Sequence, residues 1–260
     1  MLRIQQIFCA ALLVLFLPAA QARENAYDVV GKVIAPFAQV VAGSTKTKNR
    51  AITMQLRLEE AGGGDPKLAG APVDFAVQMP DRLRVTAPLG GERITVCRDG
   101  QKIWAFPGTR LQALLADPAV AKSLPAADRK FKLAPFELPI PEKQLAFLPV
   151  LFKVTEAPDE AVGETTCRVL ELELMKQLSK SLGFQNAGAR IWVAPDYALL
   201  RLAVRSEQGD FTVRFDQTRF AVALPETTWQ PTAEESADVL NLTPALYDQL
   251  VRALTVRARK

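Results

Sequence analysis

Strict alternation of apolar and polar residues recurs along most of this chain, and it limits the possible folds more than any other feature. Residues 52–58 read Ile-Thr-Met-Gln-Leu-Arg-Leu, so every second side chain is apolar. Because successive side chains of a strand point to opposite faces, this pattern predicts a half-buried β-strand. Roughly ten strands separated by turns predict an antiparallel sandwich or barrel. The other alternating rows lie at residues 73–79, 83–87, 170–174, 191–193, 200–204 and 211–215.

The stretch CRDGQKIWAF, residues 97–106, predicts a hairpin. Asp99-Gly100 suits a type I′ turn, which needs positive φ at both central positions, and this register places Thr95 opposite Trp104. Cross-strand partners share a face, so both faces of the hairpin are apolar and both need cover. One face carries Thr95, Cys97, Trp104 and Phe106, and the other carries Ile94, Val96, Ile103 and Ala105.

Three other segments have a different character. Residues 27–42 space their valines at helical intervals, and we expect Pro36 to kink or divide that helix. Residues 107–165 are rich in proline yet apolar, with short helices expected near 109–117 and 141–149. This segment is either a lid or binding element, or a helical layer that fills an ordinary core.

The C-terminal region carries a helix signal of its own. Thr243-Pro244 supplies an N-cap followed by a first-turn proline, so a helix is expected to begin there. This helix either docks on the surface of the domain or binds a partner.

The N-terminus resembles a secretory signal peptide. Arg3 precedes an apolar run, and Ala20-Gln21-Ala22 is an A-x-A cleavage site, so residues 1–22 are expected to be removed on export. An uncleaved membrane anchor is the alternative, although the run is short for a membrane span. Cys97 and Cys167 follow the cleavage site, and in an oxidising compartment they form either a disulfide or two buried free thiols.

The residue types exclude most catalytic chemistry. The chain contains no histidine, which removes His-dependent triads, His-containing zinc sites and the usual general base near neutral pH. No phosphate-binding, dinucleotide-binding or nucleophile-elbow motif occurs. Arginines are spaced along strands rather than clustered with aromatics, which argues against nucleic-acid binding. We therefore expect no enzymatic activity, no cofactor and no metal site.

Two stretches together resemble the periplasmic outer-membrane lipoprotein carrier family, the LolA-like proteins. The first, FAVQMPDRLRVTAPLGGERITVCRDGQKIWAF, contains the strand ending at Pro80 and a hairpin of the form D-G-x-x-I-W-x-F. The second, ARIWVAPDYALLRLAVRSEQGDFTVRFDQTRF, is similar to the closing strands of that family. Two positions depart from the family pattern: Met79 stands where an arginine holds the lid shut, and Val85 stands where a tryptophan is usual.

The resemblance implies a mainly β fold with helices (α+β), in which an incomplete antiparallel β-barrel wraps over lid helices. We expect the chain to comprise a signal peptide (1–22), a half-barrel carrier-like domain (23–230) with a helical insert (107–165), and a C-terminal helical tail (231–260). The expected function is a periplasmic carrier that holds acyl chains of lipoproteins, or another hydrophobic ligand, in a lidded apolar cavity for transport to the outer membrane.

The carrier hypothesis predicts which residues line the cavity. For each of them, packing in an ordinary hydrophobic core is an equally good interpretation. We expect a monomer with an acylated cargo, an inner-membrane donor and an outer-membrane acceptor. Two other functions stay open, a periplasmic sensor or regulatory interaction domain on the same fold and a structural envelope protein with a filled core. The predicted lining residues are Leu56, Phe75, Val77, Met79, Leu83, Trp104, Phe106, Phe136, Phe147, Phe152, Leu202 and Phe215.

Overall fold

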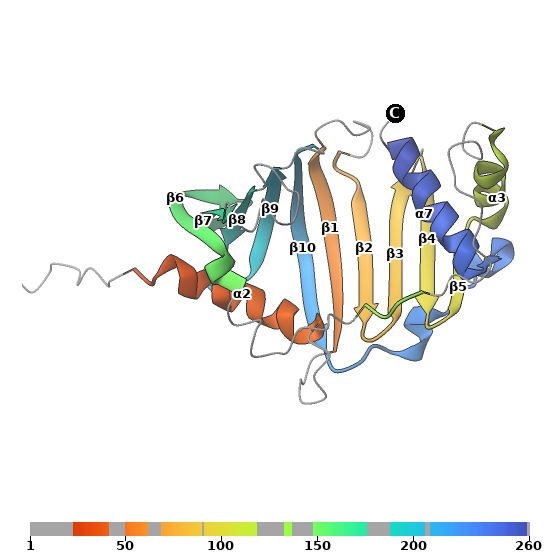
Figure 1. Ribbon diagram of the computed structural model, residues 1–260, viewed down its shortest axis with the longest axis horizontal. Helices are drawn as coiled ribbons and strands as arrows, with labels where there is room; N and C mark the ends of the chain where they lie inside the picture. Colours follow the sequence, from red (N-terminus) through yellow and green to blue (C-terminus); the bar gives the residue numbers. More distant parts are fainter. Residues whose placement is uncertain are drawn as a thin grey trace, which may run out of the picture.

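In this computed structural model, the described residues form a single antiparallel sheet of eleven strands, together with helices (Figure 1). The structure describes residues 23–41, 50–61, 69–89, 91–118, 133–136, 148–175, 188–205 and 209–258. The strand order is β11-β5-β4-β3-β2-β1-β10-β9-β8-β7-β6, and the two outer strands do not pair, so the sheet stays open. This confirms the expected incomplete barrel. The strands are β1 (Ala51–Ala61), β2 (Pro72–Gln78), β3 (Arg82–Leu89), β4 (Glu92–Asp99), β5 (Lys102–Phe106), β6 (Phe152–Val162), β7 (Thr165–Leu174), β8 (Gly188–Val193), β9 (Leu199–Arg205), β10 (Phe211–Ala221) and β11 (Leu240–Leu242).

The register sorts the alternating side chains into two faces, which we call the helix face and the strap face. Ile52 pairs with Val77, and Val77 pairs with Leu83, so these apolar residues share the helix face. Thr53 pairs with Ala76, which pairs with Arg84 on the strap face. The two-residue period of the sequence therefore accounts for the composition of each face.

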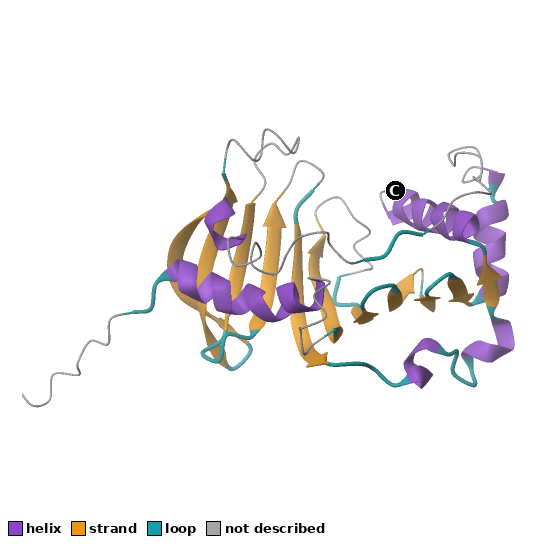
Figure 2. Ribbon diagram, turned by 60° about the horizontal axis from the view of Figure 1, so that its bottom comes forward, coloured by secondary structure: helices purple, strands orange, loops and turns teal. Residues whose placement is uncertain are grey.

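Helix α2 (Ala26–Val41) covers the helix face at the β6–β9 end of the sheet, and Figure 2 shows the strands arching over it. Its N-terminal half packs Val29, Val30 and Val33 against Leu170 and Ile191. The helix is continuous through Pro36, so of the two expected effects, a kink or a division, the division does not occur. Within the described residues, no helix has both the length and the apolarity to cross a membrane.

Helices α3 (Gly108–Ala116) and α7 (Pro244–Ala258) cover the same face at the opposite end. Leu111 and Leu250, both fully buried, pack with Ile94 and Ile103 of the hairpin. The backbone N–H of Leu246 donates to Thr243 Oγ1 (3.2 Å), which confirms the predicted helix start.

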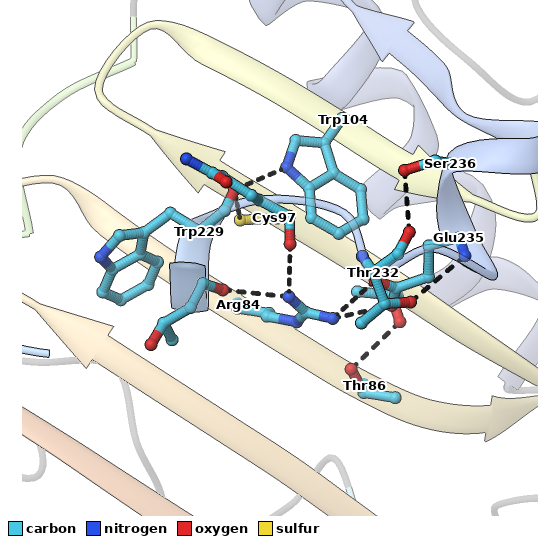
Figure 3. Close-up of polar contacts among 11 residues, drawn as sticks. Arg84, Thr86, Cys97, Trp104, Trp229, Thr232, Glu235 and Ser236 are labelled. Carbon is cyan, nitrogen blue, oxygen red and sulfur yellow. Dashed lines mark hydrogen bonds and ion pairs between the residues drawn. The ribbon is translucent and has the colours of Figure 1, made fainter. Parts of the chain in front are cut away.

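Residues 222–239 form a strap that crosses the strap face and carries the chain from β10 to β11. The strap includes the 3₁₀ helices η3 (Glu226–Trp229) and η4 (Glu235–Asp238). Trp104 Nε1 donates to the Trp229 carbonyl (2.9 Å), and the Cys97 thiol donates to the same oxygen (3.5 Å). The second apolar face of the hairpin is thus core beneath the strap (Figure 3).

An ion pair fixes the strap to β3 (Figure 3). Arg84 Nη2 donates to both Glu235 oxygens (2.8 and 2.7 Å), and Arg84 Nη1 donates to the carbonyls of Thr228 and Gln230 (3.0 Å each). The Thr232 N–H donates to Glu235 Oε2 (2.8 Å), and the Glu235 N–H donates to Thr232 Oγ1 (3.2 Å). Burial would raise the pKa of Glu235, but the hydrogen bond from Thr232, that from Thr95 and the Arg84 charge outweigh it and lower this pKa.

The structure corrects three expectations about local structure. The hairpin pairs Thr95 with Phe106 and Cys97 with Trp104, because the turn occupies Gly100 and Gln101. Only Gly100 has positive φ there, as a type II′ turn requires, and the shift by two residues preserves the faces.

The other two corrections concern the insert and the tail. The last part of the expected helical insert, 107–165, is edge strand β6, where Pro158 is tolerated. The expected helical tail, 231–260, begins inside the strap and includes β11, so it is part of the sheet as well as of the helix layer.

Candidate ligand-binding face

Between the two helix-covered ends, the helix face carries apolar side chains that are only half-buried. We call this set of residues the central strip. Adjacent strands bring them together: Phe75 pairs with Met54 on one side and with Val85 on the other. Leu56 likewise pairs with Phe215 of β10. The strip comprises Met54, Leu56, Leu58, Val73, Phe75, Val85, Val213 and Phe215.

The strip differs from the rest of the helix face in its packing. Except for Met54, none of its members belongs to the hydrophobic clusters that the described residues build with α2, α3 or α7. Neighbouring apolar side chains that are only half-buried leave apolar area in contact with water, which is costly, and a contiguous group of them fits a binding surface. The strip offers no hydrogen-bonding side chain, so it suits an apolar ligand rather than a polar one.

A packed hydrophobic cluster, which we call the closing cluster, borders the central strip near the C-terminal end of α2. Val40 of α2 packs with Ile52 and Met79, both nearly inaccessible to solvent. Phe37 meets Phe220 edge to face, with ring centroids 5.2 Å apart. Phe136, one of the few described residues of the insert, joins this cluster, and its N–H donates to the Pro80 carbonyl (2.7 Å).

The structure brings together part of the predicted cavity lining. Leu56, Phe75 and Phe215 lie in the central strip, and Leu83 and Leu202 lie at its borders on the same face. Three predicted residues, Val77, Met79 and Phe136, belong to the closing cluster. Phe152 packs near α2, and Phe147 lies outside the described residues.

Trp104 and Phe106 do not lie with the central strip, and the alternative of packing in an ordinary core describes them. Both side chains lie on the strap face, in the cluster around Trp229, because the chain returns from β10 across that face. The same strand register adds three other apolar residues to the helix face. Met54, Val85 and Val213 were missed, although the alternation of their own strands already places them on the same face as Leu56 and Phe75.

The two cysteines are free thiols, which rules out the disulfide alternative. Cys97 lies on β4 and Cys167 on β7, and six strands separate them in the sheet. Each is fully buried in a different hydrophobic cluster. Burial raises the pKa of Cys97 to about 12, so this thiol stays protonated and unreactive at neutral pH.

The strap face has a different chemistry from the central strip. One hollow of about 390 Å³ lies beside the strap and is lined mainly by polar side chains, including Gln55, Arg84 and Thr86. A second, of about 440 Å³, is lined by Glu59, Arg201 and neighbouring residues. In the described part of the chain, no group of three or more Cys, Asp or Glu residues is arranged to hold a metal ion.

Comparisons with known proteins find likeness only among solved structures. No protein-family model and no curated protein sequence matches the chain. The structure of MucB is 19% identical, with a TM-score of 0.41, 80% of this chain covered and 63% of the MucB chain spanned. The lipoprotein LppX of Mycobacterium tuberculosis is 11% identical, with a TM-score of 0.37 and coverage of 74% and 97%. A LolA superfamily protein of Nitrosomonas europaea is 12% identical, with a TM-score of 0.30 and coverage of 80% and 98%.

Proposed function

We propose that this protein binds acyl chains on the central strip and carries them between membranes through the periplasm. The observation that carries the proposal is the half-buried apolar strip itself, flanked by packed helices at both ends of one sheet face. Binding without catalysis fits a site made of aliphatic and aromatic side chains. An exported location fits the signal peptide expected at residues 1–22, which lie outside the described residues.

The dimensions and energetics of the strip suit this cargo. The strip crosses four strands, from β3 to β10, and the bordering Leu202 adds a fifth, β9. Together these five strands span about 19 Å at the usual strand spacing. That length is comparable to an extended fatty acyl chain. Each methylene moved out of water gains about 0.8 kcal/mol, so such a surface competes with a bilayer without forming a covalent bond.

The lid expected over this surface is described only in part. Of residues 107–165, the structure describes α3, residues 133–136, the short helix η2 (Leu148–Leu151) and β6. Phe136 and η2 lie on the helix face, where a cover for the cargo would have to be. We therefore propose that these described parts of the insert contribute to a cover over the bound chain, which must move aside for the cargo to enter and leave.

Isolation in the native state tests the proposal. The protein is purified from a periplasmic extract without detergent, and its mass is measured under native conditions and again after extraction with organic solvent. The expected result is an added mass that the solvent removes and that fragments as an acyl lipid. The bare polypeptide mass, together with no binding of a neutral hydrophobic fluorophore, would contradict the carrier function. A stable complex with an envelope protein and no lipid would favour the regulatory alternative.

A further inference from the structure

The helix face contains one deeply buried cation next to the central strip. Arg98 of β4 is only 3% exposed and lies between its cross-strand partners, the apolar residues Leu83 and Ile103. Two positions earlier on the same face stands Val96, which pairs with Val85 of the strip. Residues two apart on a strand are about 7 Å from each other, so Arg98 lies at the border of the strip.

Arg98 has few and weak polar partners for so buried a charge. Its Nε donates to the Gly100 carbonyl (2.9 Å), and its Nη2 reaches the Leu133 carbonyl only at 3.5 Å. The guanidinium lies over the ring of Phe136, 4.6 Å from its centroid. Among the described residues, no carboxylate lies within ion-pair distance of it.

Several other shielded arginines among the described residues are paired with a carboxylate, unlike Arg98. Arg84 pairs with Glu235 at 2.7 Å although its side chain is more exposed than that of Arg98. Three more pairs of the same kind occur, and each joins a partly shielded arginine to a glutamate. They are Arg168–Glu156, Arg190–Glu160 and Arg201–Glu59. A buried charge without a carboxylate partner is expensive, and the described residues give Arg98 none, so its guanidinium fits a partner that arrives from outside.

Among the residues that the structure describes, none near Arg98 supplies that partner. Burial lowers the pKa of Arg98, and the attraction of Asp81 and Tyr247 offsets this only in part. Asp81 lies near the hairpin turn, and Tyr247 belongs to α7. The Leu133 carbonyl, at the limit of hydrogen-bond distance, is the contact that an incoming anion would most easily replace.

We propose that Arg98 binds the oxyanion head of the amphiphile whose acyl chain lies on the central strip. This inference rests on the proposed function and names the ligand class: an acyl chain ending in a carboxylate or a phosphate. The guanidinium matches either group with two parallel hydrogen bonds, and such charge-assisted bonds are stronger inside a protein than in water. A neutral amphiphile of the same chain length lacks this contact.

The test compares palmitate with hexadecan-1-ol as competitors of a neutral hydrophobic fluorophore. The wild-type protein is expected to bind palmitate about 10- to 100-fold more tightly than the alcohol. Arg98→Gln is expected to remove most of that preference while it leaves the affinity for the alcohol within about twofold. Arg93→Gln, on the same strand but on the strap face, is the matched control and should keep the preference.

Each outcome separates the inference from the function on which it rests. If the wild-type protein binds neither ligand, the proposed function fails. If it binds both equally, or if folded Arg98→Gln keeps the preference for palmitate, the role of Arg98 is refuted. If Arg98→Gln does not fold, Arg98→Lys takes its place: a preference reduced by at least threefold supports the role, and an unchanged preference overturns it. Competition by free acetate or phosphate at the same concentration would show that the site takes the anion without the chain, which also overturns it.

Discussion

Replacing Phe75 with glutamate probes the centre of the proposed binding surface. Phe75 is half-buried on β2, between Met54 and Val85, so its ring forms part of the floor on which an acyl chain would lie. Losing the ring removes contacts with the ligand worth about 1 kcal/mol. Covering a carboxylate with an acyl chain costs at least about 2 kcal/mol more. The sum of about 3 kcal/mol predicts that Phe75→Glu weakens binding about 100-fold.

The assay is titration of the delipidated protein with a neutral hydrophobic fluorophore, with thermal unfolding measured in parallel. Gln217→Glu adds the same charge to an exposed position on the strap face of β10 and should bind the probe like wild type. Phe75→Leu keeps the site apolar and should weaken binding by less than about tenfold. If Phe75→Glu folds and binds the probe within twofold of wild type, the central strip is not the binding surface.

Three further predictions concern the strap and the thiols. Arg84→Met leaves Glu235 buried without its cation, so the free energy of unfolding, measured in urea, should fall by about 3 kcal/mol. A double variant that also carries Glu235→Leu should regain most of this lost stability. The pKa of Glu235 is lower in the folded protein than its ordinary 4.5, so its stabilising contribution is present above pH 4.5 and is lost as the pH falls below that value. Glu235→Gln should therefore make the melting temperature less dependent on pH between pH 5 and 3. A pH dependence as steep as that of the wild type would contradict this. Cys97 and Cys167 should both resist iodoacetamide in the native protein and both react after unfolding without a reductant, whereas a disulfide would leave them unreactive.

Alternation in the sequence was enough to predict the faces of the sheet. The side-chain period of a strand is two whatever the turn, so Leu56, Phe75 and Phe215 could be placed on one face before their partners were known. The hairpin shows the limit of this reasoning. Its register depends on whether Gly100 is the first or the second turn residue, and both choices give the same two faces.

Long-range packing was not predictable from local patterns. For Trp104, cavity and core stayed open, because nothing near it in the sequence shows that residues 222–239 return over its face. Strand β6 was hidden inside a proline-rich segment, since an edge strand tolerates Pro158 that a central strand would not. The special position of Arg98 was not predictable either, because the burial of its guanidinium and the carboxylates near it depend on the fold and not on its own strand.

Photo-crosslinking measures the position of the cargo directly. A palmitate that carries a diazirine in the middle of its chain is bound to the protein, and the complex is irradiated. The labelled peptides are then sequenced by mass spectrometry. Adducts are predicted on Leu56, Phe75, Val85 and Phe215, on four adjacent strands of the helix face. Adducts confined to residues of the strap face, or spread evenly over both faces, would contradict the account.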